Sequence, residues 1–267
     1  MVNFFSDIPE NIFEWIGKQH CFWVATAPLS PAGHVNVSPK GIAGTFKVLD
    51  KNTVMYQDLS GSGVETIAHI RENGRITIMF QVREILEGTW HEVGTPEFKK
   101  LIPDEERIPG SRAAIYVKLH SVSTSCGYAV PIYEFSHHRN QLISLLANKE
   151  KFDDDTEQKN LDCKSHKGMF NYWAQKNAAS IDGLLGMDIG LEIAKHQKVD
   201  IYAYKPFVHE EKRRAFAVEL KDPTAPLCRV RRVDSSYVMI GVGFVAGLLV
   251  MAAFNHFSMH FLSSFPL

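Results

Sequence analysis

Short segments with an alternating apolar pattern follow one another through the first half of the chain, and turn residues separate them. The segments are residues 22–27, 34–41, 45–50, 53–58, 75–80 and 113–123. This alternation is typical of β-strands, and Pro, Gly, Asn or Asp stand in the turns between them. Because few helices intervene, the pattern favours an antiparallel barrel or sandwich over a doubly wound parallel sheet. We therefore predict a mainly β fold with flanking helices.

Helical patterns flank the predicted strands. Ile8, Ile12, Trp15 and Ile16 lie on one helical face, and Pro9 stands where a helix would begin. Helical patterns return from about residue 134, in YEFSHHRNQLISLLANKEKF and in MFNYWAQKNAASIDGLLG. Residues 190–234 are polar and include two strand-like segments, IYAYKPFVH and AFAVEL. We predict one domain over residues 1–187, a barrel with a C-terminal helical part, followed by an extension or linker over residues 188–234.

Charge and cysteine content narrow the class of protein. The chain has 29 Lys and Arg against 30 Asp and Glu, a net charge of −1. No basic excess is available to neutralise a phosphate backbone, so we expect no nucleic-acid partner. The four cysteines are scattered without CxxC spacing, which indicates isolated thiols rather than a disulfide framework. We expect no metal site.

The C-terminal region contains an uncharged apolar stretch, residues 235–255. A helix of this length spans roughly 30 Å, the hydrocarbon thickness of a bilayer. Arg229, Arg231 and Arg232 precede it, and no Lys or Arg follows it. This flank predicts a single-pass tail anchor with the N-terminal domain in the cytosol. The alternative is a buried core helix or a hydrophobic tail of a soluble domain.

A Gly-Ser-Gly loop at residues 61–63 precedes a short helical segment that stops at Asn73-Gly74. Ser62 and Glu65 have the spacing of a capping box, so one interpretation is a well-capped helix that joins two strands. The other interpretation is that the N–H groups of residues 61–64 and the helix dipole bind an anion. The loop matches neither GxxxxGK[ST] nor GxGxxG, so the residues leave both interpretations open.

Six blocks of the sequence, taken in order, resemble one known family. The blocks are residues 34–41, 58–80, 91–98, 109–117, 124–135 and 172–184. Over residues 1–187 the chain resembles proteins of the pyridoxamine 5′-phosphate oxidase-like family. The resemblance implies a six-stranded antiparallel split barrel, which is usually a homodimer with flavin mononucleotide (FMN) at the subunit interface. The bound anion would then be the FMN phosphate.

The resemblance also implies which residues bind the cofactor. Ser38, Lys40 and Gly41 would approach the phosphate or the ribityl chain, with Lys40 as the main cation. The second contact segment would consist of Asp58, Ser60, Ser62, Glu65 and Thr66. The resemblance implies no catalytic acid or base that we can name in this chain.

Two departures from the family pattern bear on flavin binding. True pyridoxamine phosphate oxidases carry an Arg-Lys pair where this chain has Glu65-Thr66, and a carboxylate beside a phosphate is unfavourable unless it faces away. Relatives also carry a longer segment where residues 81–87 stand here, so either the barrel lacks part of a strand or the sequence has lost a piece.

These observations lead to three functional hypotheses. The first is an FMN-dependent oxidoreductase that acts on a small-molecule redox substrate and is tethered to a membrane through residues 235–255. The second is a catalytically degenerate split-barrel dimer that serves as a membrane-anchored binding or adaptor protein. The third is a flavin carrier or reductase that passes electrons to a membrane partner. In the first case the redox chemistry would be the cofactor's.

Overall fold

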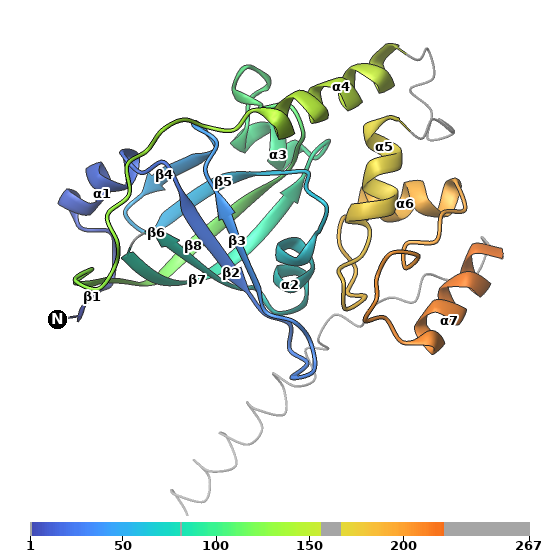
Figure 1. Ribbon diagram of the computed structural model, residues 1–267, viewed down its shortest axis with the longest axis horizontal. Helices are drawn as coiled ribbons and strands as arrows, with labels where there is room; N and C mark the ends of the chain where they lie inside the picture. The colour runs from blue at the N-terminus through green and yellow to red at the C-terminus, as the bar shows by residue number, and fades with distance from the viewer. Residues whose placement is uncertain (1, 81, 156–166, 222–267) are drawn as a thin grey trace, which may run out of the picture. The chain divides into compact units, whose positions relative to one another are not determined.

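The structure is a computed structural model that describes residues 2–80, 82–155 and 167–221 (Figure 1). Strands form most of its first half and helices most of its second half. The strands are β1 (Val2–Phe5), β2 (Phe22–Thr26), β3 (Asn36–Lys40), β4 (Phe46–Asp50), β5 (Thr53–Leu59), β6 (Arg75–Phe80), β7 (Val82–Glu92) and β8 (Ser111–Ser125). The helices are α1 (Glu10–Gly17), α2 (Glu65–Asn73), α3 (Pro96–Leu101), α4 (Gln141–Asp155), α5 (Met169–Tyr172), α6 (Asp188–His196) and α7 (Glu210–Lys221).

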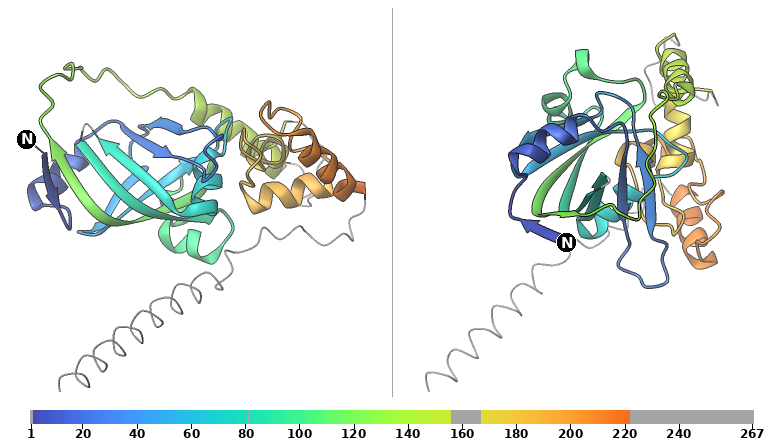
Figure 2. Two further views of the ribbon diagram at one scale, coloured as in Figure 1. Left: turned by 90° about the horizontal axis from the view of Figure 1, so that it is seen from below. Right: turned by 60° about the vertical axis from the view of Figure 1, so that its left-hand side comes forward.

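The strands form one curled antiparallel sheet, as Figures 1 and 2 show. The sheet has eight strands in the order β3-β2-β6-β7-β8-β5-β4, and β1 pairs with the end of β8. The predicted mainly β antiparallel fold with flanking helices is therefore confirmed, but six strands was too few. Within the described residues no backbone pairing joins β3 to β4, so the barrel is not closed.

Where the comparison with relatives suggested a missing part of a strand or a lost piece of sequence, residues Val82–Glu92 form strand β7. It pairs with β6 from Phe80↔Val82 to Arg75↔Glu87, and with β8 from Glu84↔Val122 to Glu92↔Ala113. A register shift lies between Ile85 and Leu86. A bulge of this kind interrupts the alternation of side chains between the two faces. The strand was missed because a search for strict alternation does not recognise a bulged strand.

Helix α1 and helices α5 to α7 lie at opposite ends of the sheet (Figures 1 and 2). The predicted first helix is confirmed as α1, which follows Pro9 and buries Ile16. Helix α2 packs on β2, β6 and β7 and buries Ile67 and Ile70 in the main core. Helices α5, α6 and α7 lie beyond α2, at the other end from α1.

The C-terminal strand-like segments are not strands. Residues 201–208 form turns, and AFAVEL lies inside helix α7. Good helix formers surround AFAVEL, and Glu210 and Glu211 stand in the first turn, where they complement the helix dipole. Phe216 of α7 is buried and packs edge-to-face on Tyr202, with their ring centroids 5.4 Å apart. Residues 1–223 form one compact unit, and the predicted boundary at residue 187 stays a prediction.

The predicted membrane localisation is corrected. Across residues 2–80, 82–155 and 167–221, no helix is both long enough and apolar enough to span a bilayer. The stretch 235–255, from which the tail anchor and the cytosolic orientation were predicted, lies outside the described residues.

Candidate functional site

Strand β3 is an edge strand that turns three polar side chains inward. Asn36, Ser38 and Lys40 are partly buried, whereas Val37 and Pro39 between them are exposed. Lys40 Nζ lies 3.0 Å from Asp58 Oδ1 on β5, and Asn36 Nδ2 donates to Thr66 Oγ1 on α2 at 3.1 Å. Side-chain contacts therefore span the open side of the sheet and hold β3 against β5 and α2.

Asp58 is fully buried and binds two cations. Its Oδ2 lies 2.9 Å from Arg112 Nε, and Arg112 Nη1 also donates to the Gly63 carbonyl at 2.7 Å. Burial alone would raise the pKa of Asp58, but the charges of Arg112 and Lys40 outweigh burial and hold it below its usual value. Asp58 is therefore ionised at neutral pH. Two cations and one carboxylate leave this group with a net positive charge.

Two buried hydroxyl groups flank this ion-paired group. Ser38 and Tyr56 stand two residues before Lys40 and Asp58 in their strands, so each shares a face with its charged neighbour. Within the described structure neither Ser38 Oγ nor Tyr56 OH has a hydrogen-bond partner. Burial and then the Asp58 charge raise the pKa of Tyr56, so its hydroxyl stays protonated. We call Ser38, Lys40, Tyr56, Asp58 and Arg112 the split-face cluster.

The Gly-Ser-Gly loop does not form the predicted capping box. Helix α2 begins at Glu65 after the N-cap residue Val64, and no side chain caps it. Glu65 Oε1 instead accepts a hydrogen bond from the backbone N–H of Ile181 at 3.2 Å, while Ser62 is exposed. A Cβ atom at Gly63 would lie 2.1 Å from Glu65 Oε2, so the folded-back carboxylate requires glycine there.

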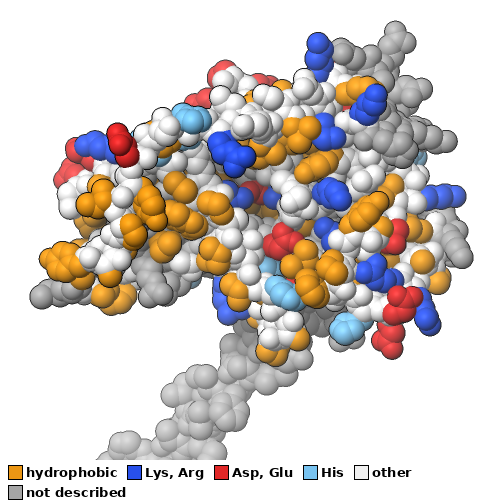
Figure 3. Space-filling view, viewed as in Figure 1, with side chains coloured by type: hydrophobic (Ala, Val, Ile, Leu, Met, Phe, Trp, Pro, Cys, Tyr) orange, Lys and Arg blue, Asp and Glu red, His pale blue; other side chains and the backbone are white. Residues whose placement is uncertain are grey.

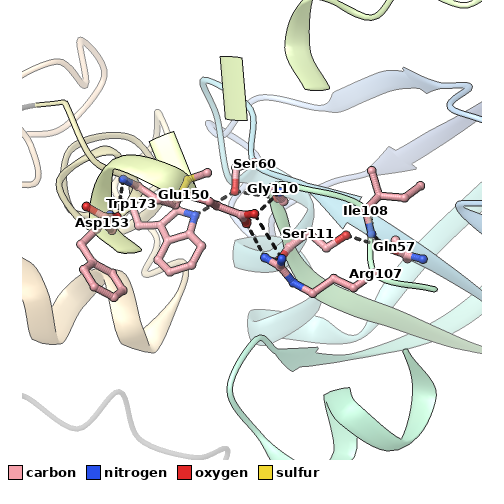
Figure 4. A network of polar contacts seen from close by, with 11 residues as sticks. Gln57, Ser60, Arg107, Ile108, Gly110, Ser111, Glu150, Asp153 and Trp173 are labelled. Carbon is pink, nitrogen blue, oxygen red and sulfur yellow. Dashed lines mark hydrogen bonds and ion pairs between the residues drawn. The ribbon is translucent and has the colours of Figure 1, made fainter. Parts of the chain in front are cut away.

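The chain's own C-terminal part covers this loop. Trp173 Nε1 donates to Ser60 Oγ at 2.8 Å, and Ser60 Oγ donates to the Gly110 carbonyl at 2.9 Å (Figure 4). Asn177 Nδ2 donates to the Gly61 carbonyl at 3.0 Å. The loop carbonyls and the Ser60 hydroxyl therefore serve internal contacts that bind the loop to residues 173–181.

A second polar chain runs beneath α2. Asn36 Nδ2 also donates to Thr26 Oγ1 at 3.1 Å, and Thr26 Oγ1 lies 2.9 Å from His69 Nδ1. Burial lowers the pKa of His69, and the nearby carboxylates of Glu65, Glu72 and Asp182 offset this only in part. His69 is therefore neutral at neutral pH and fixes the inner side of α2.

Figure 4 shows how the helical part is attached to the sheet. The Arg107 guanidinium pairs with the Glu150 carboxylate of α4, and Glu150 Oε1 accepts from the Gly110 N–H at 2.9 Å. On the sheet side, Gln57 Oε1 accepts from Ser111 Oγ at 2.7 Å and from the Ile108 N–H at 3.0 Å. These contacts fix the start of β8, from which Arg112 reaches Asp58.

The structure divides the eight predicted cofactor-binding residues into three groups. Ser38, Lys40 and Asp58 come together in the split-face cluster, and Gly41 directly follows Lys40. Ser60, Glu65 and Thr66 make the internal contacts given above, and Ser62 is exposed.

Sequence analysis missed Arg112 and Tyr56. Arg112 directly precedes the predicted strand 113–123, and no local pattern shows that it reaches a carboxylate 54 residues away. Nothing in the sequence distinguishes Tyr56 from the other residues of the predicted strand 53–58. Its lack of a partner is visible only in the folded chain.

Comparison with known proteins identifies the family. The family model described as pyridoxamine 5′-phosphate oxidase matches residues 8–126. The pyridoxamine 5′-phosphate oxidase family protein ustO of Aspergillus flavus is 31% identical over 198 residues, which cover 69% of this chain and 77% of that protein.

Solved structures resemble the chain only distantly. HupZ of Group A Streptococcus is 18% identical with a TM-score of 0.34, and the match covers 42% of this chain and 89% of that one. A FAD-binding protein of Mesorhizobium loti is 12% identical with a TM-score of 0.30, and the match covers 47% of this chain and 99% of that one. Scores this low do not bear on function. By its sequence relatives, the chain belongs to the pyridoxamine 5′-phosphate oxidase family.

Proposed function

We propose that this protein binds FMN, with the phosphate or ribityl chain at the split-face cluster, and acts as an FMN-dependent oxidoreductase on a small-molecule substrate. Family membership supports the cofactor class, because proteins of this family generally bind flavin. Bound FMN would supply the redox chemistry. The residues of this chain would bind it, orient it and tune its electrostatic surroundings.

The observation that carries the proposal is the buried, unpartnered Ser38 hydroxyl beside Lys40 on the same face of β3. A buried hydroxyl without a partner is costly, so a ligand that accepts its hydrogen bond would be favoured. The Lys40 side chain is 23% exposed and donates one hydrogen bond to Asp58, and an ammonium group has three donors. The net positive charge of the cluster also suits a phosphate. Ser38 and Lys40 therefore fit the group.

The second predicted contact segment fits the phosphate less well. Ser60 and Thr66 already make internal hydrogen bonds, and Glu65 places a carboxylate at the start of α2. We accordingly assign the cofactor contacts to the β3 side, at Ser38, Lys40 and Gly41. We also propose that the protein is a homodimer, since the family's flavin site lies between subunits.

A binding experiment tests the proposal. The full chain, purified from cells supplied with riboflavin, should show a flavin absorption spectrum, and denaturation should release FMN. Lys40→Gln should weaken FMN binding about 10- to 100-fold, the effect of losing one hydrogen bond to a charged group. Lys47→Gln is the matched control, because Lys47 on β4 pairs with Glu106 outside the cluster. A Lys40→Gln variant that is folded and binds FMN like the unmodified chain would refute the phosphate assignment.

A second candidate function is a binding or adaptor protein without catalysis. The contacts of Trp173 with Ser60 and of Asn177 with Gly61 favour it, because these groups serve internal hydrogen bonds and are not free to bind a ligand. A folded, colourless chain that takes up no added FMN would support this alternative and refute the oxidoreductase. Reduction of bound flavin by a nicotinamide donor would instead point to a carrier or reductase.

A further inference from the structure

A pocket of about 390 Å³ lies at the end of the sheet where α1 packs. Its walls include Phe13, Ile16, Phe22, Phe46, Val48 and Phe80. The volume is within the range of small-molecule sites, which is roughly 300–1,000 Å³. In Figure 3, hydrophobic side chains also gather on the surface over α1 and β1. The pocket therefore lies in a largely apolar part of the molecule.

The lining of the pocket favours an uncharged ligand. None of the residues that line it is Lys, Arg, Asp or Glu. A buried ion without a counter-charge is strongly disfavoured, so an occupant should be uncharged. Two of the polar lining residues already donate to backbone carbonyls, Gln19 to Trp15 at 3.0 Å and Thr45 to Ile42 at 2.6 Å.

Three phenylalanine rings define the geometry of the inner wall. The ring centroids of Phe22 and Phe46 are 4.9 Å apart, those of Phe46 and Phe80 are 5.0 Å apart, and both pairs meet edge to face. Such rings present edges and faces to which another aromatic ring can pack in the same manner. The wall therefore favours a planar aromatic occupant over a flexible aliphatic one.

Two imidazole rings stand at this pocket. His20 and His138 both line it, with ring centroids 6.0 Å apart, and His20 stacks on Phe135 at 3.8 Å. An imidazole nitrogen can donate or accept a hydrogen bond. The segment that follows β8 carries Phe135 and His138, so it brings these rings against the end of α1. An occupant with one hydroxyl or carbonyl group could form a hydrogen bond with one of these imidazole rings.

We propose that this pocket binds a small, uncharged, planar aromatic molecule with one hydrogen-bonding group directed at His20 and His138. This site shares Gly41 with the proposed flavin contacts, but neither Ser38 nor Lys40 lines it. The proposal does not depend on flavin binding. It assigns a function to the aromatic end of the sheet, which the split-face cluster does not use.

Calorimetric titration of the full chain with 1-naphthol tests this proposal. The probe is uncharged at neutral pH, and 1-naphthoate offers the same rings with a negative charge. We expect 1-naphthol to bind at one site with a Kd on the order of 0.1 mM, which is reasonable for a ligand of this size. We expect 1-naphthoate to bind at least tenfold more weakly, and FMN not to compete with 1-naphthol.

Gly17→Leu is the most direct variant. Gly17 ends α1 and lines the pocket, and a Cβ atom there would meet nothing within 4 Å. The leucine should reach into the pocket and weaken 1-naphthol binding at least tenfold. Asn11→Leu is the control, because this exposed residue of the same helix does not line the pocket. Its affinity should be unchanged.

Val48→Phe enlarges another residue that lines the pocket and serves as a second test if Gly17→Leu is unstable. Circular dichroism and thermal melting would show that each variant is folded. Equal binding of 1-naphthol by the unmodified chain and both folded pocket variants would overturn the proposal. So would equal affinity for 1-naphthoate, or displacement of 1-naphthol by FMN, which would place the flavin itself in this pocket.

Discussion

Lys40 on β3 contacts Asp58 on β5 across the open side of the sheet, with Nζ 3.0 Å from Oδ1. Strands β3 and β5 are not neighbours in the sheet, so no backbone hydrogen bonds join them. The ion pair between Lys40 and Asp58 connects the two strands instead. Arg112 holds the other carboxylate oxygen. The same contact thus supports the fold and sets the charge of the candidate cofactor site.

Asp58→Asn should destabilise the protein by about 3–5 kcal/mol, because it leaves two cations without their buried counter-charge. Urea denaturation at neutral pH measures the change. Glu210→Gln is the control, since Glu210 pairs with Arg214 on the surface, where both side chains are more than half exposed. That variant should change stability by no more than about 0.5 kcal/mol. A similar small effect for Asp58→Asn would contradict the role assigned to the carboxylate.

The contribution of Asp58 should also depend on pH. Because the pKa of Asp58 is depressed in the folded protein, the native state binds its proton less readily than the unfolded state. The stabilisation is therefore present above the ordinary aspartate pKa of about 3.9 and is lost as the pH falls through the lower folded value. Denaturation curves from pH 6 downward should show the difference between the unmodified chain and Asp58→Asn shrinking below about pH 4. A constant difference would argue against an ionised Asp58.

Glu92 attaches helix α6 to the sheet. Its carboxylate accepts from the backbone N–H groups of Asp188 at 2.7 Å and Ile189 at 3.2 Å, at the start of α6. Glu92→Ala leaves both part-buried donors without their charged acceptor and should cost about 1–3 kcal/mol. In this variant, backbone hydrogen exchange in α6 should become faster relative to that in β2 than it is in the unmodified chain. Unchanged protection of α6 would show that Glu92 does not hold it.

The pH dependence of Glu92 has the opposite sign to that of Asp58. Burial raises the pKa of Glu92, and the two N–H groups at α6 offset this only in part. The native state therefore binds this proton more readily, and stability falls as the pH rises from the ordinary glutamate pKa of about 4.3 through the folded value. Glu92→Gln should remove this component from urea denaturation measured across that window. An unaltered pH profile would contradict the raised pKa.

Gly110→Ala should be more harmful than Gly94→Ala, although both glycines have positive φ, 82° and 92°. Each variant loses the left-handed conformation that glycine tolerates, at a cost of about 1 kcal/mol. At Gly110 the new Cβ would also lie 2.2 Å from Leu146 Cδ1 and 2.7 Å from Leu146 Cβ, whereas at Gly94 it meets nothing within 4 Å. Overpacking should add about 1–3 kcal/mol at Gly110. Equal melting temperatures for the two variants would contradict this account.

Regular local patterns allowed the sequence to predict several elements. Strands β2 and β6 alternate between buried and more exposed residues, β4 and β5 are followed by turn residues, and α1 carries its apolar residues on one face. Prediction failed where neighbours decide the outcome. The bulge between Ile85 and Leu86 hides β7, which pairing on both sides supports. The segment AFAVEL alternates like a strand, but its helix-forming surroundings and the burial of Phe216 make it part of α7.

The sequence by itself determined the class of fold, from local patterns along the chain, and the family resemblance, which in turn implied the candidate residues Ser38, Lys40 and Asp58. Only the tertiary structure decided what those residues contact. Arg112 is 54 residues from Asp58, and Asn177 is 116 residues from Gly61, to whose carbonyl its side chain donates a hydrogen bond. Local preferences cannot encode such pairings, since they form only when the curled sheet and the C-terminal helices pack together. Packing therefore left the Ser38 hydroxyl without a hydrogen-bond partner within the described residues, whereas Ser60 and Glu65 form hydrogen bonds inside the protein.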